Sequence, residues 1–110
     1  MPIRTLCARS PQQCWAGGYN GFIAVTHDAG KTWHEMEAYN TIYNRIVFDR
    51  FGQGWAAGAR GAIVRAEEEG GRWAVYRLAG SVPVNSVRFI SDSVGVAVGA
   101  RGTIVTFKTR

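Results

Sequence analysis

A repeat with a period of about 40 residues organises this chain. Residues 14–23 read CWAGGYNGFI, residues 54–63 read GWAAGARGAI and residues 95–104 read GVAVGARGTI. Glycines recur at positions 18, 58 and 99, and again at 21, 61 and 102, so the spacings are 40 and 41. Self-similarity at a fixed period of this length is typical of folds built from copies of one supersecondary unit. The chain is therefore predicted to contain three imperfect copies of such a unit.

Each copy has the pattern of short antiparallel strands. Its β-branched and aromatic runs are bounded by glycine, and no window shows a sustained helical period. The third copy has strands predicted at 86–90, 96–99 and 103–107, and the first two copies add a fourth strand at 33–38 and 73–78. We expect one partial all-β domain over residues 1–110, with four-stranded units at about 3–38 and 44–78. A third unit at 85–108 lacks its outer strand.

A Gly-x-x-Gly turn joins the second and third strands of each copy. Such a tight hairpin needs residues with positive φ, which glycine and asparagine accept more readily than residues with long side chains. Asn20 suits this geometry, whereas Arg60 and Arg101 do not. We predict that Gly61 and Gly102 take the positive φ, the alternative being strained arginines.

Residues 26–33 read THDAGKTW and match the complete pattern Ser/Thr-x-Asp-x-Gly-x-Thr-Trp. The aspartate is expected to accept hydrogen bonds from its own turn, the glycine to permit the bend, and the tryptophan to pack beneath. A degenerate copy of this pattern follows at 66–73. The structural residues predicted for the motif are Thr26, Asp28, Gly30, Thr32 and Trp33.

With this motif and the Gly-Trp-Ala-x-Gly-x-x-Gly-x-Ile block, the chain resembles the Asp-box (BNR-type) repeat β-propellers. It is most similar to the photosystem II assembly-factor-like propeller family. The resemblance covers nearly the whole chain and implies propeller blades and a non-enzymatic role in protein interaction or assembly. In sialidases the same boxes lie at turns away from the ligand face, so the motif implies structure and not chemistry.

Complete propellers have about four to eight blades. An arc of three blades exposes the apolar flanks of its first and last blades, which monomeric proteins avoid. The sequence therefore leads us to expect a homodimer that closes a six-bladed ring. The alternative is that these residues are a piece of a longer propeller.

The candidate binding residues follow from blade topology, because the turns between second and third strands and the links between blades emerge on one face. Aromatic side chains beside Arg and Asn suit recognition of a peptide, an acidic group or a sugar. The alternative is that Asn44 and Asn85 bond backbone while Arg60 and Arg101 are solvated. The predicted ligand-binding residues are Tyr19, Asn20, Tyr39, Tyr43, Asn44, Arg60, Asn85 and Arg101.

The net charge of +5 comes from 13 basic residues against 8 acidic ones, and arginine dominates the basic set. Arginine favours carboxylates and phosphates, so an acidic protein or a glycan is the candidate partner, and ordinary surface charge is the alternative for most of the arginines. The basic residues form no run, so a nucleic acid is not indicated. With no apolar segment of membrane length, no leader and only Cys7 and Cys14, we expect a cytoplasmic protein with two buried thiols on neighbouring strands. A disulfide across the hairpin is the alternative.

Catalysis has little support in the sequence. There is no phosphate loop, no Gly-x-Ser-x-Gly and no paired-His metal spacing, so neither a metal nor a cofactor is expected. A sialidase needs several arginines, a tyrosine nucleophile and an acid/base around one centre. We expect a protein-binding or assembly module that is not an enzyme, with a lectin-like propeller as the alternative. A glycoside hydrolase remnant is the weakest hypothesis.

Overall fold

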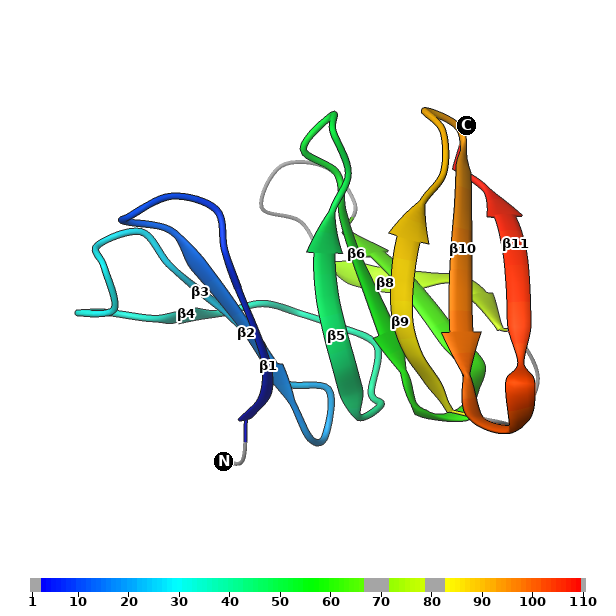
Figure 1. The fold of residues 1–110 in the computed structure, drawn as a ribbon. Coiled ribbons are helices and arrows are strands. Elements are labelled where there is room, and N and C mark those ends of the chain that lie inside the picture. The colour runs from blue at the N-terminus through cyan, green and yellow to red at the C-terminus, as the bar shows by residue number, and fades with distance from the viewer. Residues whose placement is uncertain (1–2, 67–71, 79–82, 110) are drawn as a thin grey trace.

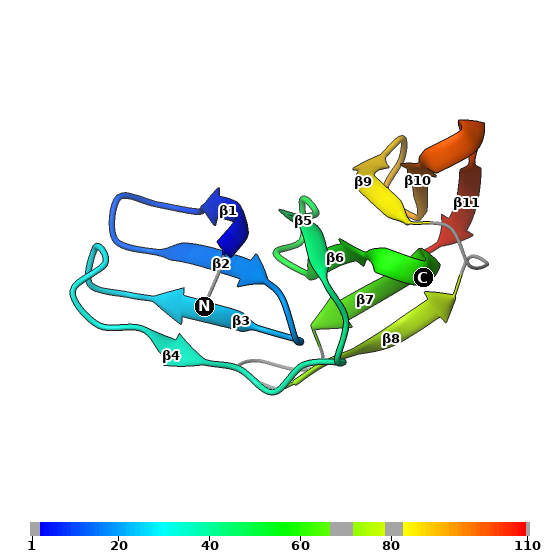
Figure 2. The same cartoon turned by 90° about the horizontal axis from the view of Figure 1, so that it is seen from below.

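The computed structural model describes residues 3–66, 72–78 and 83–109. These residues form three antiparallel sheets that stand side by side in an arc, with the N-terminus and the C-terminus at opposite ends of it (Figure 1). Viewed from below, the sheets follow one another like the blades of a partly built ring (Figure 2). The described residues contain only strands, turns and two short 3-10 segments. The predicted all-β fold is confirmed.

Each sheet is a meander in which strands that follow one another in the chain pair with each other. The first sheet holds β1 (Ile3–Ala8), β2 (Cys14–Gly18), β3 (Ile23–Thr26) and β4 (His34–Glu35). The second holds β5 (Tyr43–Phe48), β6 (Gly54–Gly58), β7 (Ala62–Ala66) and β8 (Trp73–Leu78). The third holds β9 (Val84–Phe89), β10 (Val94–Gly99) and β11 (Ile104–Lys108).

The strand register repeats from sheet to sheet. Leu6 pairs with Ala16 in the first sheet, Ile46 pairs with Ala56 in the second, and Val87 pairs with Ala97 in the third. Paired residues of an antiparallel sheet lie on the same face. Ile46 and Ala56 belong to the core shared with the first sheet, and Val87 and Ala97 belong to the core shared with the second. The 40-residue sequence repeat is therefore a repeat of three-dimensional position.

The hydrophobic core lies between neighbouring sheets and has two parts. Between the first and second sheets, the Trp15 and Trp73 rings lie 5.4 Å apart, and Trp73 meets Phe48 edge-on at 6.2 Å. Between the second and third sheets, the ring centroids of Trp55 and Phe107 lie 5.3 Å apart. Tilted and edge-on aromatic pairs add to the stabilisation that burial provides. The buried residues are Ile23, Tyr43, Ile46, Ala56, Ala62, Val64 and Trp73 in the first part, and Trp55, Ala57, Ile63, Val84, Val87, Ala97 and Phe107 in the second.

The outer strand of the first sheet differs from its prediction. A strand was expected over 33–38, but β4 has only two residues, His34 and Glu35. The chain then leaves the sheet, because Trp73 donates its backbone N–H to the Glu37 carbonyl at 2.7 Å and accepts a hydrogen bond from Tyr39 at 2.8 Å. The segment 37–39 therefore ties the first sheet to β8 of the second.

The turns between second and third strands also differ from expectation. Arg60 and Arg101 both have a φ of 61°, and the following glycines, Gly61 and Gly102, are left-handed as well. Asn20 and Gly21 repeat the same pair of conformations. Two successive positive φ angles define a type I′ turn, whose twist matches that of the flanking strands. The prediction that glycine alone takes the positive φ is wrong, because this turn requires it at both central positions.

The turn over residues 26–33 is closed by the aspartate, as expected. Asp28 accepts hydrogen bonds from the Thr32 hydroxyl at 2.6 Å, the Thr32 backbone N–H at 2.8 Å and the Thr26 hydroxyl at 2.8 Å. These donors lower the pKa of Asp28 from 3.8 to about 2. Gly30 bends the chain at φ 92°. Trp33 departs from its expected place beneath the turn, because its side chain is 43% exposed. The degenerate copy of the motif at 66–73 falls mostly on 67–71, outside the described residues.

The two cysteines lie on neighbouring strands, as predicted. Cys7 pairs with Trp15 and Ala8 pairs with Cys14, so the two cysteines are offset by one position in the β1–β2 pair and their side chains leave opposite faces of the sheet. Both thiols are free, and they are half-buried rather than buried. Burial raises the pKa of the Cys7 thiol, and the nearby Arg9 opposes that shift.

Candidate functional site

One face of the arc gathers the features that the sequence associated with binding. We call it the loop face. It contains the β2–β3 turn, the 3-10 turns η1 (Ala59–Gly61) and η2 (Ala100–Gly102), and the link 36–42 between β4 and β5. It forms the lower edge of Figure 1 and faces the viewer in Figure 2. Residues 79–83, which join β8 to β9, lie mostly outside the described residues.

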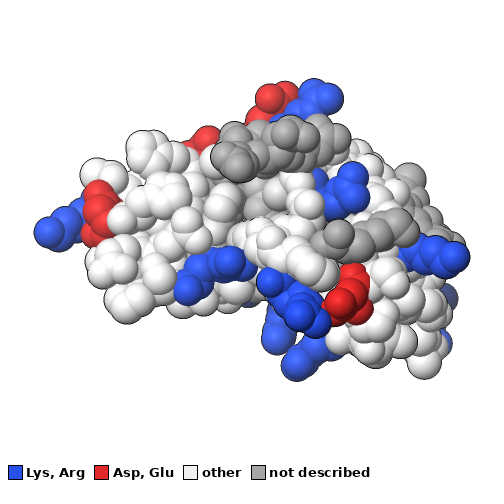
Figure 3. Space-filling model, turned by 90° about the horizontal axis from the view of Figure 1, so that it is seen from above, with Lys and Arg blue, Asp and Glu red and all other residues white. Residues whose placement is uncertain are grey.

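The opposite face carries mixed charge. Figure 3 views the molecule from that side and shows several Lys and Arg groups close together at the lower middle with an acidic group beside them, and further groups of both signs near the edges. One of these arginines, Arg50, forms an ion pair with Asp92 at 2.8 Å. Such an exposed pair contributes little stability, and it partly neutralises this face. The predicted binding residues Arg60 and Arg101 lie instead on the loop face.

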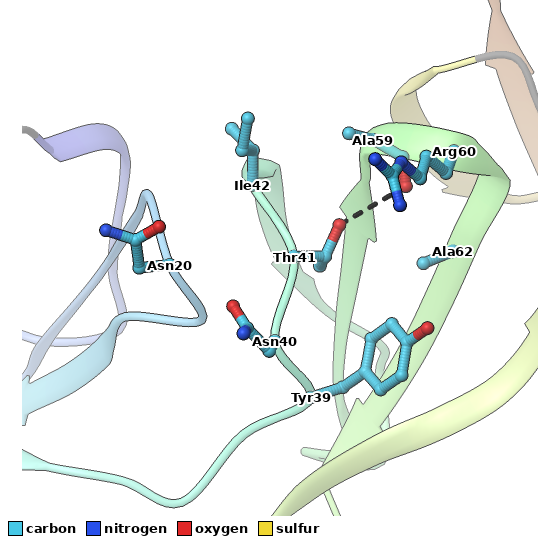
Figure 4. Close-up of a pocket in the computed structure, with 8 residues that line it drawn as sticks. All are labelled: Asn20, Tyr39, Asn40, Thr41, Ile42, Ala59, Arg60 and Ala62. Carbon is cyan, nitrogen blue, oxygen red and sulfur yellow. Dashed lines mark hydrogen bonds between the residues drawn. The ribbon is translucent and has the colours of Figure 1, made fainter.

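A pocket of about 230 Å³ opens on the loop face where the first and second sheets meet (Figure 4). It brings together three of the predicted binding residues, Asn20, Tyr39 and Arg60. They come from the β2–β3 turn, the 36–42 link and η1. The prediction missed the other five residues that line it: Asn40, Thr41, Ile42, Ala59 and Ala62.

The lining of this pocket is polar and carries a positive charge. It contains two asparagine amides, a threonine, a tyrosine and the Arg60 guanidinium, and no acidic residue. Thr41 donates its hydroxyl hydrogen bond to the Ala59 carbonyl at 3.3 Å, which ties the link to η1 beside Arg60. A site with amide and guanidinium donors and no carboxylate is suited to an anionic oxygen ligand.

A second cluster runs along the inner strands, the first strand of each sheet. The Arg4 guanidinium donates to Asn44 Oδ1 at 3.2 Å and to the Tyr19 hydroxyl at 3.1 Å. Asn44 donates in turn to the Val84 carbonyl at 3.0 Å. Asn44 thus bonds backbone, as in the alternative to its predicted binding role, but the carbonyl belongs to the next sheet. These hydrogen bonds join the three sheets. Arg4, which makes two of them, was not among the predicted binding residues.

Tyr43 is not accessible to a ligand, in contrast to its prediction. The irregularity between positions 43 and 45 of β5 turns its side chain into the core, where it is fully buried. Its hydroxyl donates to the Tyr39 carbonyl at 2.6 Å, and burial raises its pKa strongly. Tyr43 therefore holds the 36–42 link in place. Asn85 and Arg101 are exposed on the third sheet and do not line the pocket.

Within 3–66, 72–78 and 83–109, no three His, Cys, Asp or Glu side chains lie close enough together to hold a metal ion. Those same ranges contain no helix of the length and apolarity that a bilayer span requires.

The fold and the loop face define a segment of a β-propeller whose blades present polar turns on one side. The search against family models found no match. In sequence, the chain is 32% identical over 69 residues to the photosystem II assembly lipoprotein Ycf48 of Trichormus variabilis and of Nostoc, and 35% identical over 60 residues to that of Picosynechococcus. The first two matches cover 60% of this chain. The resemblance predicted from the motifs is confirmed.

The structural comparison agrees on the fold. YCF48 from Cyanidioschyzon merolae superposes with a TM-score of 0.72 over 96% of this chain, at 20% sequence identity. The chain covers 33% of that structure and about a fifth of the length of the curated relatives that it matches. Its sequence and its fold therefore both correspond to part of a larger propeller.

The prediction of a cytoplasmic protein is wrong. The relatives are named lipoproteins of photosystem II assembly, and a lipoprotein is anchored to a membrane surface by its lipid. The prediction relied on the lack of a leader and of a disulfide framework in these residues. Neither absence determines the compartment, since the matched segment is a small part of a longer relative.

Proposed function

We propose that this chain is a non-enzymatic protein-binding module of an assembly propeller and that it binds its partner through the loop face. The similarity to proteins named for photosystem II assembly supports a role in assembly. The observation that carries the proposal is the pocket between the first and second sheets. Arg60 lines it together with two asparagines and a tyrosine, and no carboxylate is among its lining residues. The partner is expected to present an acidic side chain or a chain-terminal carboxylate.

The backbone at η1 supports this assignment. Arg60 is held at φ 61° and ψ 27°, a region that residues with long side chains seldom adopt. Arg101 repeats this conformation at φ 61° and ψ 32° in η2. Asn20 stands at the same turn position in the first sheet, so the turn itself does not require arginine. Arginine at two of these three turns supports a use for the guanidinium groups on the loop face.

The test replaces Arg60 and Arg101 by asparagine, which keeps the left-handed turn and removes both charges. The probe is a fluorescein-labelled glutamate-rich peptide, with a Gly-Ser peptide of equal length as the neutral comparison. We expect the wild-type chain to bind the acidic peptide and the double variant to bind it at least about tenfold more weakly, the loss expected for charged hydrogen bonds. Arg50→Ala, on the opposite face, is the matched control and should bind like the wild type.

Two results would contradict the proposal. One is equal affinity of the wild type and the double variant for the acidic peptide. The other is saturable binding to a glycan array that survives loss of both arginines, because it favours the lectin-like alternative. Model sialosides should show no turnover, as expected of a protein that is not an enzyme.

Two further parts of the proposal concern architecture. We propose that residues 26–33 serve as a structural Asp-box, as the hydrogen bonds to Asp28 support. We also propose that the chain pairs with a second copy to form a six-bladed homodimer, with blades at about 3–38, 44–78 and 85–108. The exposed apolar flanks of the arc support this pairing.

A further inference from the structure

The turn between the first and second strands occurs in all three sheets and offers three versions of one position. In each turn, the residue at this position donates its backbone N–H to the carbonyl four residues later. The three residues are Arg9, Asp49 and Ile90. These turns lie on the face opposite the loop face, at the upper edge of Figure 1. Because their backbone is the same, the effect of each side chain can be compared directly.

In the second sheet this position forms a hydrogen bond with a tryptophan. Trp55 donates its indole N–H to Asp49 Oδ2 at 3.1 Å. Asp49 Oδ1 accepts the backbone N–H groups of Phe51 and Gln53, each at 2.9 Å. Trp55 is fully buried, and a buried polar group requires such a partner. One carboxylate therefore satisfies the indole and closes the turn.

The third sheet has neither member of this pair. Val96 stands at the position of Trp55, and Ile90 stands at the position of Asp49. No indole donor is left without an acceptor there. The second and third sheets are thus both self-consistent, one with the pair and one without it.

The first sheet keeps the donor without the acceptor. Trp15 stands at the position of Trp55, but Arg9 stands at the position of Asp49, and a guanidinium has no acceptor atom. Among the residues that the structure describes, the Trp15 Nε1 atom is buried and has no hydrogen-bond partner. Leaving a buried donor unsatisfied is costly, so the position calls for an acceptor from elsewhere.

The two tryptophan rings are placed alike against the next sheet. The Trp15 ring lies 5.5 Å from the Phe48 ring with an interplanar angle of 50°. The Trp55 ring lies 5.9 Å from the equivalent Phe89 ring with an angle of 59°. This matching placement indicates that the Trp15 indole N–H is directed to the turn at Arg9, as the Trp55 indole is directed to Asp49.

Arg9 adds a positive charge beside the unsatisfied donor. Its side chain is exposed, and its Cζ atom lies 4.2 Å from the centroid of the same Phe48 ring that contacts Trp15. In the described part of the chain Arg9 forms no ion pair. The indole and the guanidinium therefore offer only hydrogen-bond donors around one ring.

The turn itself requires neither arginine nor a carboxylate at position 9. Ser10 Oγ accepts the backbone N–H groups of Gln12 and Gln13 at 3.2 and 3.0 Å, which replaces the part that Asp49 has in the second sheet. The Arg9 side chain is thus left available for another partner.

We infer that the first sheet binds a carboxylate at this turn, in the place that the Asp49 carboxylate takes in the second sheet. One oxygen accepts the Trp15 indole N–H, and the other accepts a charge-assisted hydrogen bond from the Arg9 guanidinium. The carboxylate comes either from a free small acid or from an acidic side chain of a partner. The site lies on the face opposite the loop face, and the proposed function does not depend on it.

Nuclear magnetic resonance of the ¹⁵N-labelled chain reports each indole separately. The chain has four tryptophans, and Trp15→Phe and Trp55→Phe assign the two cross-peaks of interest. The probes are sodium acetate and the capped peptide acetyl-Gly-Glu-Gly-amide, titrated at pH 7 and constant ionic strength. We expect a saturable downfield shift of the Trp15 indole proton with a Kd of about 1 mM, as for two hydrogen bonds to a charged group. The Trp55 indole, already bonded to Asp49, should not shift.

Arg9→Gln tests the guanidinium. It removes the charge from position 9, and we expect both probes to bind at least about tenfold more weakly. Arg50→Gln, in the corresponding turn of the second sheet, is the matched control and should leave the Trp15 shift unchanged, because Arg50 is paired with Asp92. Both arginines are exposed, so both variants should retain the circular dichroism of the wild type.

Arg9→Asp supplies the acceptor from the chain itself, as in the second sheet. The Trp15 indole proton of this variant should resonate downfield without any ligand, and neither probe should shift it further. Its melting temperature should exceed that of the wild type at pH 7, because a buried donor gains an acceptor. The hydrogen bond lowers the pKa of the new carboxyl, so this gain should be lost as the pH falls below about 4.

The two probes separate the two sources of the carboxylate. Tighter binding of the peptide than of acetate assigns the site to an acidic side chain of a partner. Equal or weaker binding of the peptide assigns it to a free small acid. Either result supports the inference.

Three results would overturn it. These are a Trp15 indole that neither probe shifts, a shift that is as large in Arg9→Gln as in the wild type, and equal shifts of the Trp15 and Trp55 indoles. The double variant of Arg60 and Arg101 to asparagine separates this site from the loop face, since it should keep the Trp15 shift. Failure of the Trp15 response with intact glutamate-rich peptide binding at the loop face counts against this inference alone.

Discussion

At the residue scale, Asp28 shows how one carboxylate organises a turn. Its hydrogen bonds with Thr32 and Thr26 favour the charged form, which is why its pKa falls to about 2. Ala29 takes a φ of 61° within this turn, a conformation that the surrounding hydrogen bonds must hold. The stability of this turn should therefore depend on the charge of the Asp28 carboxylate, and so on pH.

Asp28→Asn tests this link. Because the folded-state pKa of Asp28 lies below 3.8, its contribution to stability is present above about pH 4 and is lost as the pH falls toward 2. We expect the melting temperature of the variant to lie below that of the wild type at pH 7 and the gap to shrink between pH 4 and pH 2. Asp92→Asn, which removes an exposed ion pair, is the control. A gap that stays constant over this range would contradict the assignment.

The residues of the candidate site show where sequence interpretation succeeds and fails. Asn20, Tyr39 and Arg60 lie together on one face because blade topology determines where turns emerge. Tyr43 was misplaced, since a local irregularity in β5 reverses the side of its side chain. Arg4 was missed, although its equivalence to Asn44 in the 40-residue repeat was a signal that pointed to it.

At the element scale, two glycines make room for aromatic rings between sheets. A Cβ on Gly54 would lie 2.5 Å from Trp73 Cη2, and a Cβ on Gly95 would lie 2.5 Å from Phe107 Cζ. In the second sheet the ring beside the glycine, Trp73, comes from β8, whereas in the third sheet the ring, Phe107, comes from β11. The first sheet has Cys14 at the equivalent position.

Gly54→Ala and Gly95→Ala are therefore expected to destabilise the fold by about 1–3 kcal/mol, because the added methyl displaces a packed ring. Cys14→Ala, at the equivalent position of the first sheet, is the matched control and is expected to change stability by less than about 1 kcal/mol. Urea denaturation of the three variants measures the difference. Equal effects at all three positions would contradict the packing explanation.

The strands themselves illustrate the limit of local patterns. The strand predicted at 73–78 coincides with β8, whose residues pair regularly with β7 apart from one irregularity. The strand predicted at 33–38 shortens to His34 and Glu35, because 37–39 bonds to Trp73 in the next sheet. That partner is distant in sequence, and no local pattern of residues 33–38 indicates it.

At the scale of the whole molecule, the middle sheet differs from the two outer ones because both of its faces are covered. Every residue of β6 is buried, whereas β1 and β11 alternate between buried or half-buried and exposed positions. Amides in well-packed elements exchange with solvent only through large openings, whereas those at uncovered edges exchange through local ones. The uncovered faces of the first and third sheets should therefore determine which amides respond to the proposed pairing with a second copy.

Hydrogen exchange at two concentrations measures this response. If a second copy covers these two faces, as in the proposed homodimer, amides of β1 and β11 should be protected at high protein concentration and lose protection on dilution into the monomer. Amides of β6 should change much less, because their environment lies within one chain. Leu6→Asp, which places a charge on the uncovered face of the first sheet, is the control and should show the diluted pattern at every concentration. Protection in β1 and β11 that is independent of concentration in the wild type would contradict the homodimer, because mass action requires association-dependent stability to vary with concentration.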